Sequence, residues 1–362
     1  MNLSTLMEHT LAFLRRHRLW LLPVAMVALV VFLFVVWVFW WPNWFSDPDR
    51  RTIIVSKGAS FSEVLDSLES NGIVGNRWTI KVAARVLDMS TSVMVGKYVF
   101  ESGVTNHGIL AHLRDGTSRV LIPVSIPEGA RMRSVAARYA RGIDADSARF
   151  MELCTDTAFI GSLGISAPDL EGYLLPDTYN FHWETDERSV IREMVGAFLE
   201  FYSDSLIERQ KEMRLSMHQI ITMASIVEGE SKKDDERAVI SGVYYNRLKK
   251  RMRLEADPTI QYIIPDGPRR LTYRDLDTPS PYNTYRNYGL PPGPVNNPGR
   301  KAILASLYPE EHGYLFFVAD GFGGHTFTRT FSEHRRAVRD FRRIRRMQQQ
   351  AAALESSGPS SP

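Results

Sequence analysis

The sequence predicts an α+β protein that one N-terminal helix ties to a membrane. Three observations carry this prediction: an uncharged apolar run at 19–41, short apolar strands alternating with amphipathic helices after it, and a composition that is 44% hydrophobic and 23% charged. This composition is typical of globular proteins and excludes global disorder and collagen-like repeats. The chain of 362 residues is long enough for roughly two domains of ~150 residues each.

Charge and cysteine content exclude further classes. Lys+Arg number 44 against 41 Asp+Glu, and the net charge of +3 gives no indication of a nucleic-acid partner. The single cysteine, Cys154, rules out an intramolecular disulfide framework and a cysteine-based zinc site. The nine histidines show no ligand-like spacing, and neither a P-loop nor a G-x-G-x-x-G fingerprint occurs. We therefore expect no metal, no cofactor and no nucleic acid.

The run at 19–41 has the length of a transmembrane helix, since a bilayer core needs about 20 apolar residues. Pro23 lies near its start, where the missing N–H costs least. Because Arg15, Arg16 and Arg18 precede the run, the positive-inside rule places 1–18 in the cytoplasm and the rest of the chain outside. Tryptophans gather at the far end, as they do at a membrane interface: Trp37, Trp40, Trp41 and Trp44.

A cleaved signal peptide is the alternative interpretation of this run. Its apolar core would be shorter, and small residues would follow it. Here Trp40-Trp41-Pro42-Asn43 follows, which makes a poor cleavage site. The sequence therefore favours an uncut single-pass anchor in a bacterial inner membrane, with the rest of the chain in the periplasm or its equivalent.

Two strand–glycine–helix units follow the anchor, within 46–121. One begins with an apolar strand at 53–55 and the other with a strand at 98–100, and each continues through a glycine turn into a short amphipathic helix. These units resemble a LysM-type strand–helix module, a class that commonly binds glycan. A packing module that binds nothing fits the pattern equally well.

A larger domain of mixed helices and strands is predicted over 122–347. Helices are expected at 132–139, 144–159, 186–212, 217–227, 235–250, 301–307 and 332–347, and strands at 124–126, 314–318 and 325–330. The loop at 257–300 is unusually long, which is typical of functional or disordered segments, and its five tyrosines argue against disorder. The last helix is rich in arginine, and 348–362 is predicted to be a disordered tail.

Glu228 is the strongest candidate for chemistry. It ends the apolar helical stretch 219–227 and shares a helix face with Ala224. A carboxyl among such neighbours is partly removed from water, which favours its protonated form and suits a general acid. The alternative is structural: a helix-end carboxylate that caps the next helix or pairs with Lys232 or Arg247.

Polar and aromatic side chains downstream are the candidate substrate-binding residues. Tyrosine faces and asparagine amides suit sugar rings, which offer one apolar face and many hydroxyls. The same residue types also suit a loop core or a buried structural bridge. The candidates are Asn246, Asp257, Tyr282, Asn283, Tyr285 and His325.

An ordered set of motifs lies between about Ile53 and Arg339. The motifs include Leu170-Glu171-Gly172-Tyr173, Ala224-Ser225-Ile226-Val227-Glu228-Gly229-Glu230, Tyr245-Asn246-Arg247-Leu248, Asp257-Pro258-Thr259, Ser280-Pro281-Tyr282-Asn283, Gly289-Leu290-Pro291-Pro292-Gly293, Asn297-Pro298-Gly299 and Gly324-His325-Thr326-Phe327. This ordered set resembles one family, the YceG-like endolytic murein transglycosylases (MltG). The family often has Lys and Thr where this chain has Gly229 and Ser231, but both neighbouring glutamates are kept.

The resemblance implies a bacterial inner-membrane lyase that cuts MurNAc–GlcNAc bonds inside nascent peptidoglycan strands and needs no cofactor. It implies that Glu228 protonates the glycosidic oxygen and then deprotonates the muramoyl C6 hydroxyl, which leaves a 1,6-anhydroMurNAc end. It also implies a LysM-like module before the catalytic domain, and partners among the peptidoglycan synthases of elongation or division. One carboxyl suffices for this chemistry, whereas glycoside hydrolases usually use two.

Two other hypotheses stay open. The first is a muramidase in which Glu228 is the acid and Asp257 or Glu230 is the second carboxylate. The second is a non-catalytic, membrane-tethered scaffold that binds glycan and recruits wall synthases. The kind of glycan end that forms separates the two enzymes, and the absence of any bond cleavage would indicate the scaffold.

Overall fold

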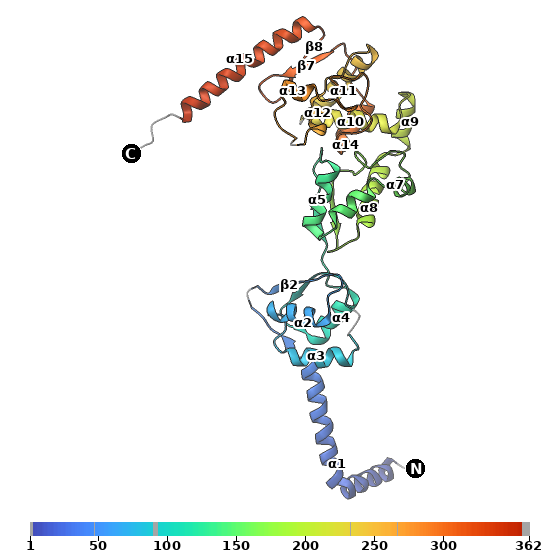
Figure 1. Ribbon diagram of the computed structural model, residues 1–362. Helices are drawn as coiled ribbons and strands as arrows, with labels where there is room; N and C mark the ends of the chain where they lie inside the picture. Colours follow the sequence, from blue (N-terminus) through green and yellow to red (C-terminus); the bar gives the residue numbers. More distant parts are fainter. Residues whose placement is uncertain (1–2, 47, 90–92, 232, 266, 357–362) are drawn as a thin grey trace, which may run out of the picture. The chain divides into compact units, whose positions relative to one another are not determined.

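The computed structural model describes residues 3–46, 48–89, 93–231, 233–265 and 267–356 (Figure 1). Helices alternate with short strands, so the mixed α+β class predicted from the sequence is confirmed. The described strands pair into four sheets of two strands each. The chain divides into two compact units: Met1–Ile122 with Asn180–Glu184, and Pro123–Tyr179 with Thr185–Pro362.

Helix α1 (Leu3–Trp40) contains the candidate anchor. Its part Leu22–Trp40 is long and apolar enough to cross a membrane, and nearly all of it is exposed in the structure. A signal sequence would pass the same test of length and composition. Pro23 lies inside this helix rather than near its start, because the residues before it include no helix breaker and continue the helix toward the N-terminus.

The first unit is built on an antiparallel pair, β2 (Arg50–Val55) with β3 (Gly96–Glu101). The two predicted strand–helix units therefore form one module, in which their strands pair with each other. Helices α2 (Phe61–Ser70) and α4 (Asn106–Asp115) follow the strands as predicted. A short second pair joins β1 (Pro42–Asn43) to β4 (Val104–Thr105).

Helix α3 (Arg77–Val86) was not predicted from the sequence. It begins at Asn76, whose side chain accepts hydrogen bonds from the backbone N–H groups of Trp78 and Thr79. The first unit also includes 180–184, where Glu184 Oε2 accepts a hydrogen bond of 2.7 Å from the backbone N–H of Lys57.

The second unit begins with short elements. Two of the predicted helices, at 144–159 and 186–212, are each broken in two. Asp156 starts a new helix by accepting hydrogen bonds from the backbone N–H groups of Ala158 and Phe159, and Ser203 occupies the N-cap of another. The elements are β5 (Ile122–Ser125), which pairs with β6 (Thr178–Phe181), and the helices α5 (Met132–Ile143), α6 (Ser147–Leu153), α7 (Thr157–Ser162), α8 (Glu187–Phe201) and α9 (Asp204–Glu212).

Helix α10 (Met217–Glu230) lies at the centre of the second unit. Every residue from Ile220 to Val227 is buried, as expected for a helix that other elements enclose on all sides. Helices α11 (Asp234–Lys249), α12 (Asp257–Ile263) and α14 (Arg300–Leu307) pack against α10 or against each other.

The segment 257–300, predicted as a loop, begins with a helix, α12. Pro258 occupies the first turn of this helix, where no backbone N–H is needed. A single further turn, α13 (Tyr273–Leu276), lies in the middle of the segment. The rest of 257–300 has no regular structure among the described residues.

The second unit ends with the hairpin of β7 (Phe316–Ala319) and β8 (His325–Thr328), followed by α15 (Phe331–Ser356). The sequence predicted that this last helix ends near Met347. The helix instead runs on through nine further residues of the predicted tail to Ser356, because the Gln and Ala residues at 348–353 are good helix formers. Residues 357–362 of the predicted tail lie outside the described residues.

Asn297 joins distant segments in the core of the second unit. Its side-chain oxygen accepts hydrogen bonds from the backbone N–H groups of Gly172 (2.8 Å) and Leu174 (3.0 Å). Its amide nitrogen donates to the carbonyl of Ala130 (2.9 Å) and to Glu171 Oε1 (3.0 Å). Because the residue is fully buried, no water replaces these partners if the amide is removed.

We expect Asn297→Ala to lower the free energy of unfolding by at least about 3 kcal/mol, since each buried polar group left without a partner costs roughly 1–3 kcal/mol. Asn287→Ala is the matched control, because that exposed side chain bonds only carbonyls of its own loop, and we expect it to cost less than about 1 kcal/mol. Chemical unfolding of the full chain in detergent measures both. Equal losses in the two variants would contradict a central role for Asn297.

Candidate active site

Glu228 lies near the C-terminal end of α10, with its side chain only 7% exposed. Its Oε2 accepts two hydrogen bonds, from Arg237 Nη1 at 2.7 Å and from the backbone N–H of Gly299 at 3.0 Å. Gly299 is the N-cap of α14, so the carboxylate faces the positive end of that helix. No donor among the described residues bonds Oε1, so the structure fixes one oxygen and leaves the other for a ligand.

Arg237 is a buried cation that joins three acidic side chains. It lies on α11 and its side chain is 5% exposed. Besides contacting Glu228, its Nη2 lies 3.5 Å from Glu128 Oε2, and its Nε lies 3.3 Å from Asp234 Oδ1. The ion-pair partner of Glu228 is therefore Arg237, and not Arg247 as the structural alternative allowed. Arg247 contacts Glu255 instead, and Lys232, the other residue named there, lies outside the described residues.

Glu128 is a second carboxyl at this site, and the sequence analysis missed it. It follows β5 in the chain and is about half exposed. Partial burial raises the pKa of Glu128, the negative charge of Glu228 raises it further, and Arg237 lowers it. A Cβ at Gly299 would collide with the Glu128 carboxyl, so only glycine fits there without a shift.

A groove of about 730 Å³ is lined by residues next to the two glutamates in the chain, although neither Glu128 nor Glu228 belongs to its lining. Gly129 and Gly229, the chain neighbours of Glu128 and Glu228, both line it, as does the ring of Tyr262. An aromatic face beside polar backbone suits a sugar ring. Helix α10 continues through Gly229 to Glu230, and a Cβ at Gly229 would approach the ring of Pro258 to 2.6 Å.

The two carboxylates predicted for a hydrolase belong to a separate cluster. Tyr285 Oη donates to Asp257 Oδ1 at 2.6 Å, and Tyr244 Oη donates to Glu230 Oε1 at 2.7 Å. Burial raises the pKa of Glu230 to about 7, although the Tyr244 hydroxyl opposes the rise. Neither carboxylate forms a hydrogen bond or an ion pair with Glu228 in the part of the chain that the structure describes.

The two candidate asparagines act as structural bridges in the structure. Asn246 donates to the backbone carbonyls of His312 (2.8 Å) and Tyr314 (3.1 Å), and so ties α11 to the segment before β7. Asn283 is fully buried, and its amide donates to two carbonyls at 276–278. Their amide nitrogens are therefore already engaged.

The remaining two candidates lie in different surroundings. Tyr282 lies beside Tyr262, with ring centroids 5.0 Å apart, and so borders the groove through that ring. His325 lies on β8, where its Nδ1 is 2.6 Å from Glu236 Oε2. This pair joins the hairpin to α11, and no described hydrogen bond or ion pair connects it to Glu228.

Comparison with known proteins identifies the family. The family model described as YceG-like matches residues 53–340, which is most of the chain. The chain belongs to the YceG-like family. The matched range agrees with the ordered motifs between Ile53 and Arg339, so the family predicted from those motifs is confirmed.

Relatives of this YceG-like protein share one name. The endolytic murein transglycosylase of Bacillus subtilis is 31% identical over 312 residues, covering 80% of this chain and 85% of the relative. The protein of that name from Streptococcus pneumoniae R6 is 28% identical over 304 residues, covering 74% of this chain, and the chain spans only 54% of that relative. A solved YceG-like protein of Listeria monocytogenes has a TM-score of 0.58 at 30% identity, covering 80% of this chain and 99% of its own.

Glu171 is a buried acid in the wall of the groove, 4% exposed. It accepts a hydrogen bond of 2.9 Å from the backbone N–H of Met132, in addition to the one from Asn297. Burial raises the pKa of Glu171 to about 8, and the Met132 hydrogen bond opposes the rise. The folded YceG-like protein therefore holds this proton to a higher pH than the unfolded chain does.

We expect the stability of this YceG-like protein to fall as the pH rises from about 4.5 to 8. In that window the folded state binds a proton at Glu171 that the unfolded state has lost, which costs up to about 1.4 kcal/mol per pH unit. Glu171→Gln should remove this part of the pH dependence, because the amide oxygen can keep both hydrogen bonds. Thermal unfolding of the full chain in detergent from pH 5 to 8 measures the effect, and parallel curves for the two proteins would contradict it.

Proposed function

We propose that this YceG-like protein is a membrane-anchored endolytic transglycosylase that cleaves MurNAc–GlcNAc bonds within peptidoglycan strands and leaves 1,6-anhydroMurNAc ends. The enzyme class and the murein substrate rest on the family and on the relatives that carry this name. One observation carries the assignment of Glu228: it is a nearly buried carboxyl whose chain neighbour Gly229 lines a groove, with one oxygen held and the other open.

In the proposed mechanism Glu228 acts first as an acid and then as a base. Oε1 gives its proton to the glycosidic oxygen, and the bond from that oxygen to muramoyl C1 breaks. Arg237 and the N–H of Gly299 stabilise the carboxylate that remains. The carboxylate then takes the proton of the muramoyl C6 hydroxyl, whose oxygen bonds to C1. Water is not consumed, and Glu228 ends protonated as it began.

The proposed anchor is Leu22–Trp40, with the N-terminus in the cytoplasm and the chain after the anchor on the periplasmic side or its equivalent. The arginines at 15–18 support this orientation through the positive-inside rule. Such an anchor would hold the groove within reach of strands that are being made at the membrane. Peptidoglycan synthases as partners, and a LysM-like glycan-binding role for the first unit, belong to the same proposal.

We expect Glu228→Gln to lower the cleavage rate by at least about a hundredfold, since general acid–base catalysis typically contributes 10²–10⁴-fold. The amide keeps the shape of the side chain but has no proton to give, so glycan binding should persist. Digestion of purified peptidoglycan, with mass spectrometry of the new ends, measures this. Glu208→Gln, an exposed change on α9, is the matched control and should cleave like the wild type. If Glu228→Gln cleaved at the wild-type rate, Glu228 would not be the acid.

A muramidase is the second candidate, because Glu128 supplies another carboxyl beside Arg237. The kind of end distinguishes the two enzymes: hydrolysis leaves ordinary reducing ends, whereas the transglycosylase leaves anhydro ends. For the transglycosylase we expect Glu128→Gln and Asp257→Asn to keep anhydro products, with a rate loss within about tenfold. Reducing ends from the wild type, together with an inactive Glu128→Gln, would establish the hydrolase instead.

A further inference from the structure

Helix α3 of the first unit presents one face to the core and leaves the other uncovered. The buried face consists of Thr79, Ile80, Ala83 and Ala84. On the opposite face Trp78 is 52% exposed and Val86 is 67% exposed, and Lys81 and Arg85 are exposed beside them. A helix face that combines a tryptophan, valines and long basic side chains is typical of helices that lie in a membrane interface.

Trp78 shows where this face lies relative to the candidate span. Its ring centroid is 6.0 Å from that of Phe34 and 6.0 Å from that of Trp37. Both partners belong to the apolar segment Leu22–Trp40, and Phe34 precedes its end by about 9 Å of helix rise. Helix α3 therefore begins at the level of the last turns of the span rather than beyond them.

Contacts within the first unit fix this level. The amide of Asn106 donates to the carbonyl of Val38, on α1, at 2.8 Å and to Thr79 Oγ1, on α3, at 3.0 Å. The ring of Trp40 stacks on that of His107 at 5.9 Å. One buried amide thus ties the end of the span to α3.

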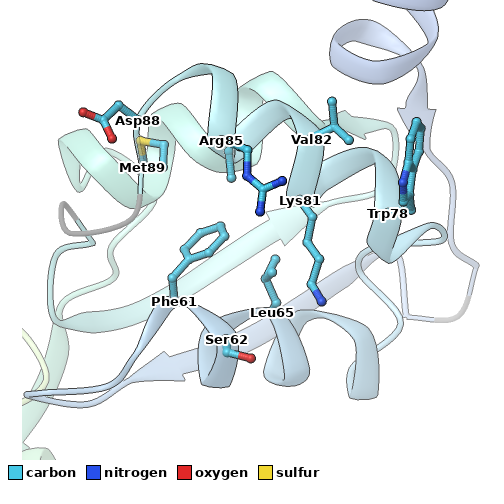
Figure 2. Close-up of a pocket in the computed structure, with 10 residues that line it drawn as sticks. Phe61, Ser62, Leu65, Trp78, Lys81, Val82, Arg85, Asp88 and Met89 are labelled. Atoms are coloured by element: carbon cyan, nitrogen blue, oxygen red, sulfur yellow. The ribbon is translucent and has the colours of Figure 1, made fainter.

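A groove of about 540 Å³ lies between α2 and α3, and Figure 2 shows its lining. Lys81 and Arg85 extend from α3 toward Phe61 and Leu65 of α2, whereas Val82 points to the side from which α1 arrives. Val82 is half-buried, lines the same groove and packs against the core of the first unit, so apolar and basic side chains of α3 meet at the groove.

The two cations of the groove have no acidic partner among the described residues. By contrast, the neighbouring Arg77 pairs with Asp66 and Glu69. Asp88 also lines the groove, so its described lining holds two cations and one acid. The groove therefore combines a net positive charge with an apolar lining, and both suit an anion that carries apolar chains.

We propose that α3 lies in the membrane interface and that this groove holds the phosphate headgroup of an anionic phospholipid from the leaflet in which α1 ends. Trp78 lies at the depth of an aromatic belt, and Lys81 and Arg85 reach the phosphates while their stems cover apolar surface. The exposed part of Val82 faces the acyl chains. This inference rests on the proposed anchor but is independent of the chemistry of Glu228.

The depth of α3 is tested with a fluorescent label on the full chain. Cys154 is the chain's single cysteine and is buried, so Val82→Cys, at a half-buried position, offers one partly exposed thiol. The protein is labelled with an environment-sensitive dye and reconstituted into phosphatidylcholine vesicles with or without phosphatidylglycerol. We expect blue-shifted emission and quenching by a lipid-borne nitroxide, whereas a label at exposed Lys57→Cys stays in water.

Headgroup binding is tested with a double variant, Lys81→Gln with Arg85→Gln. Phosphatidylglycerol that co-purifies after detergent extraction is measured by mass spectrometry. Loss of two cations at an anionic surface predicts a drop of roughly thirtyfold. Lys57→Gln with Arg114→Gln removes the same charge from the first unit outside the groove, and should retain the lipid at the wild-type level.

The outcomes separate the anchor from the lipid site. A chain that fails to float with vesicles would overturn the anchor and this inference together. A chain that floats while the label at position 82 stays in water would overturn the inference alone. Equal lipid retention in both double variants would show that the groove does not hold the headgroup. Displacement of the label by soluble glycan fragments would indicate that the groove binds glycan instead.

Discussion

The buried amide of Asn297 determines where the candidate catalytic carboxyl lies. It holds the segments at 129–130 and 171–174 against its own segment, although more than a hundred residues of sequence separate it from them. Two residues later, the N–H of Gly299 bonds Glu228, and Glu128 directly precedes the first of these held segments. The Asn297 side chain forms four hydrogen bonds, and through them it fixes the surroundings of both carboxyls.

The sequence predicted much of the fold because local patterns decide most of these elements. The apolar helix at 217–227 and the glutamate at its end are visible as composition, and the motifs predict the family. Glu128 was missed as a site residue because its partner Arg237 is 109 residues away in sequence. Arg237 was missed because Glu228, only nine residues away, lies on a different helix. A cation on the buried face of a predicted helix, beside Ile240, was the available signal for Arg237. For Glu128, the only indication in the sequence was the glycine that follows it, which predicts a turn.

The predicted sugar-binding residues show why residue type alone is a weak guide to a site. Asparagine and tyrosine side chains can hydrogen-bond the hydroxyls of a sugar. In this fold, however, their polar groups already form hydrogen bonds within the protein. Asn246 and Asn283 hold backbone carbonyls, and Tyr285 holds Asp257. The groove beside Glu228 is lined instead by backbone at two glycines and by Tyr262, which no periodicity in the sequence distinguishes from an ordinary loop.

Residues 180–184 belong to the first unit, although the segments before and after them belong to the second. This arrangement has a consequence for limited proteolysis. The covalent chain leaves the first unit after Ile122, returns to it at Asn180 and leaves it again after Glu184. A protease that nicks the chain after Ile122 would cut the peptide bond without detaching 180–184, where Glu184 still holds the backbone of Lys57. The nicked protein should therefore migrate as two bands under denaturing conditions and as one particle under native ones.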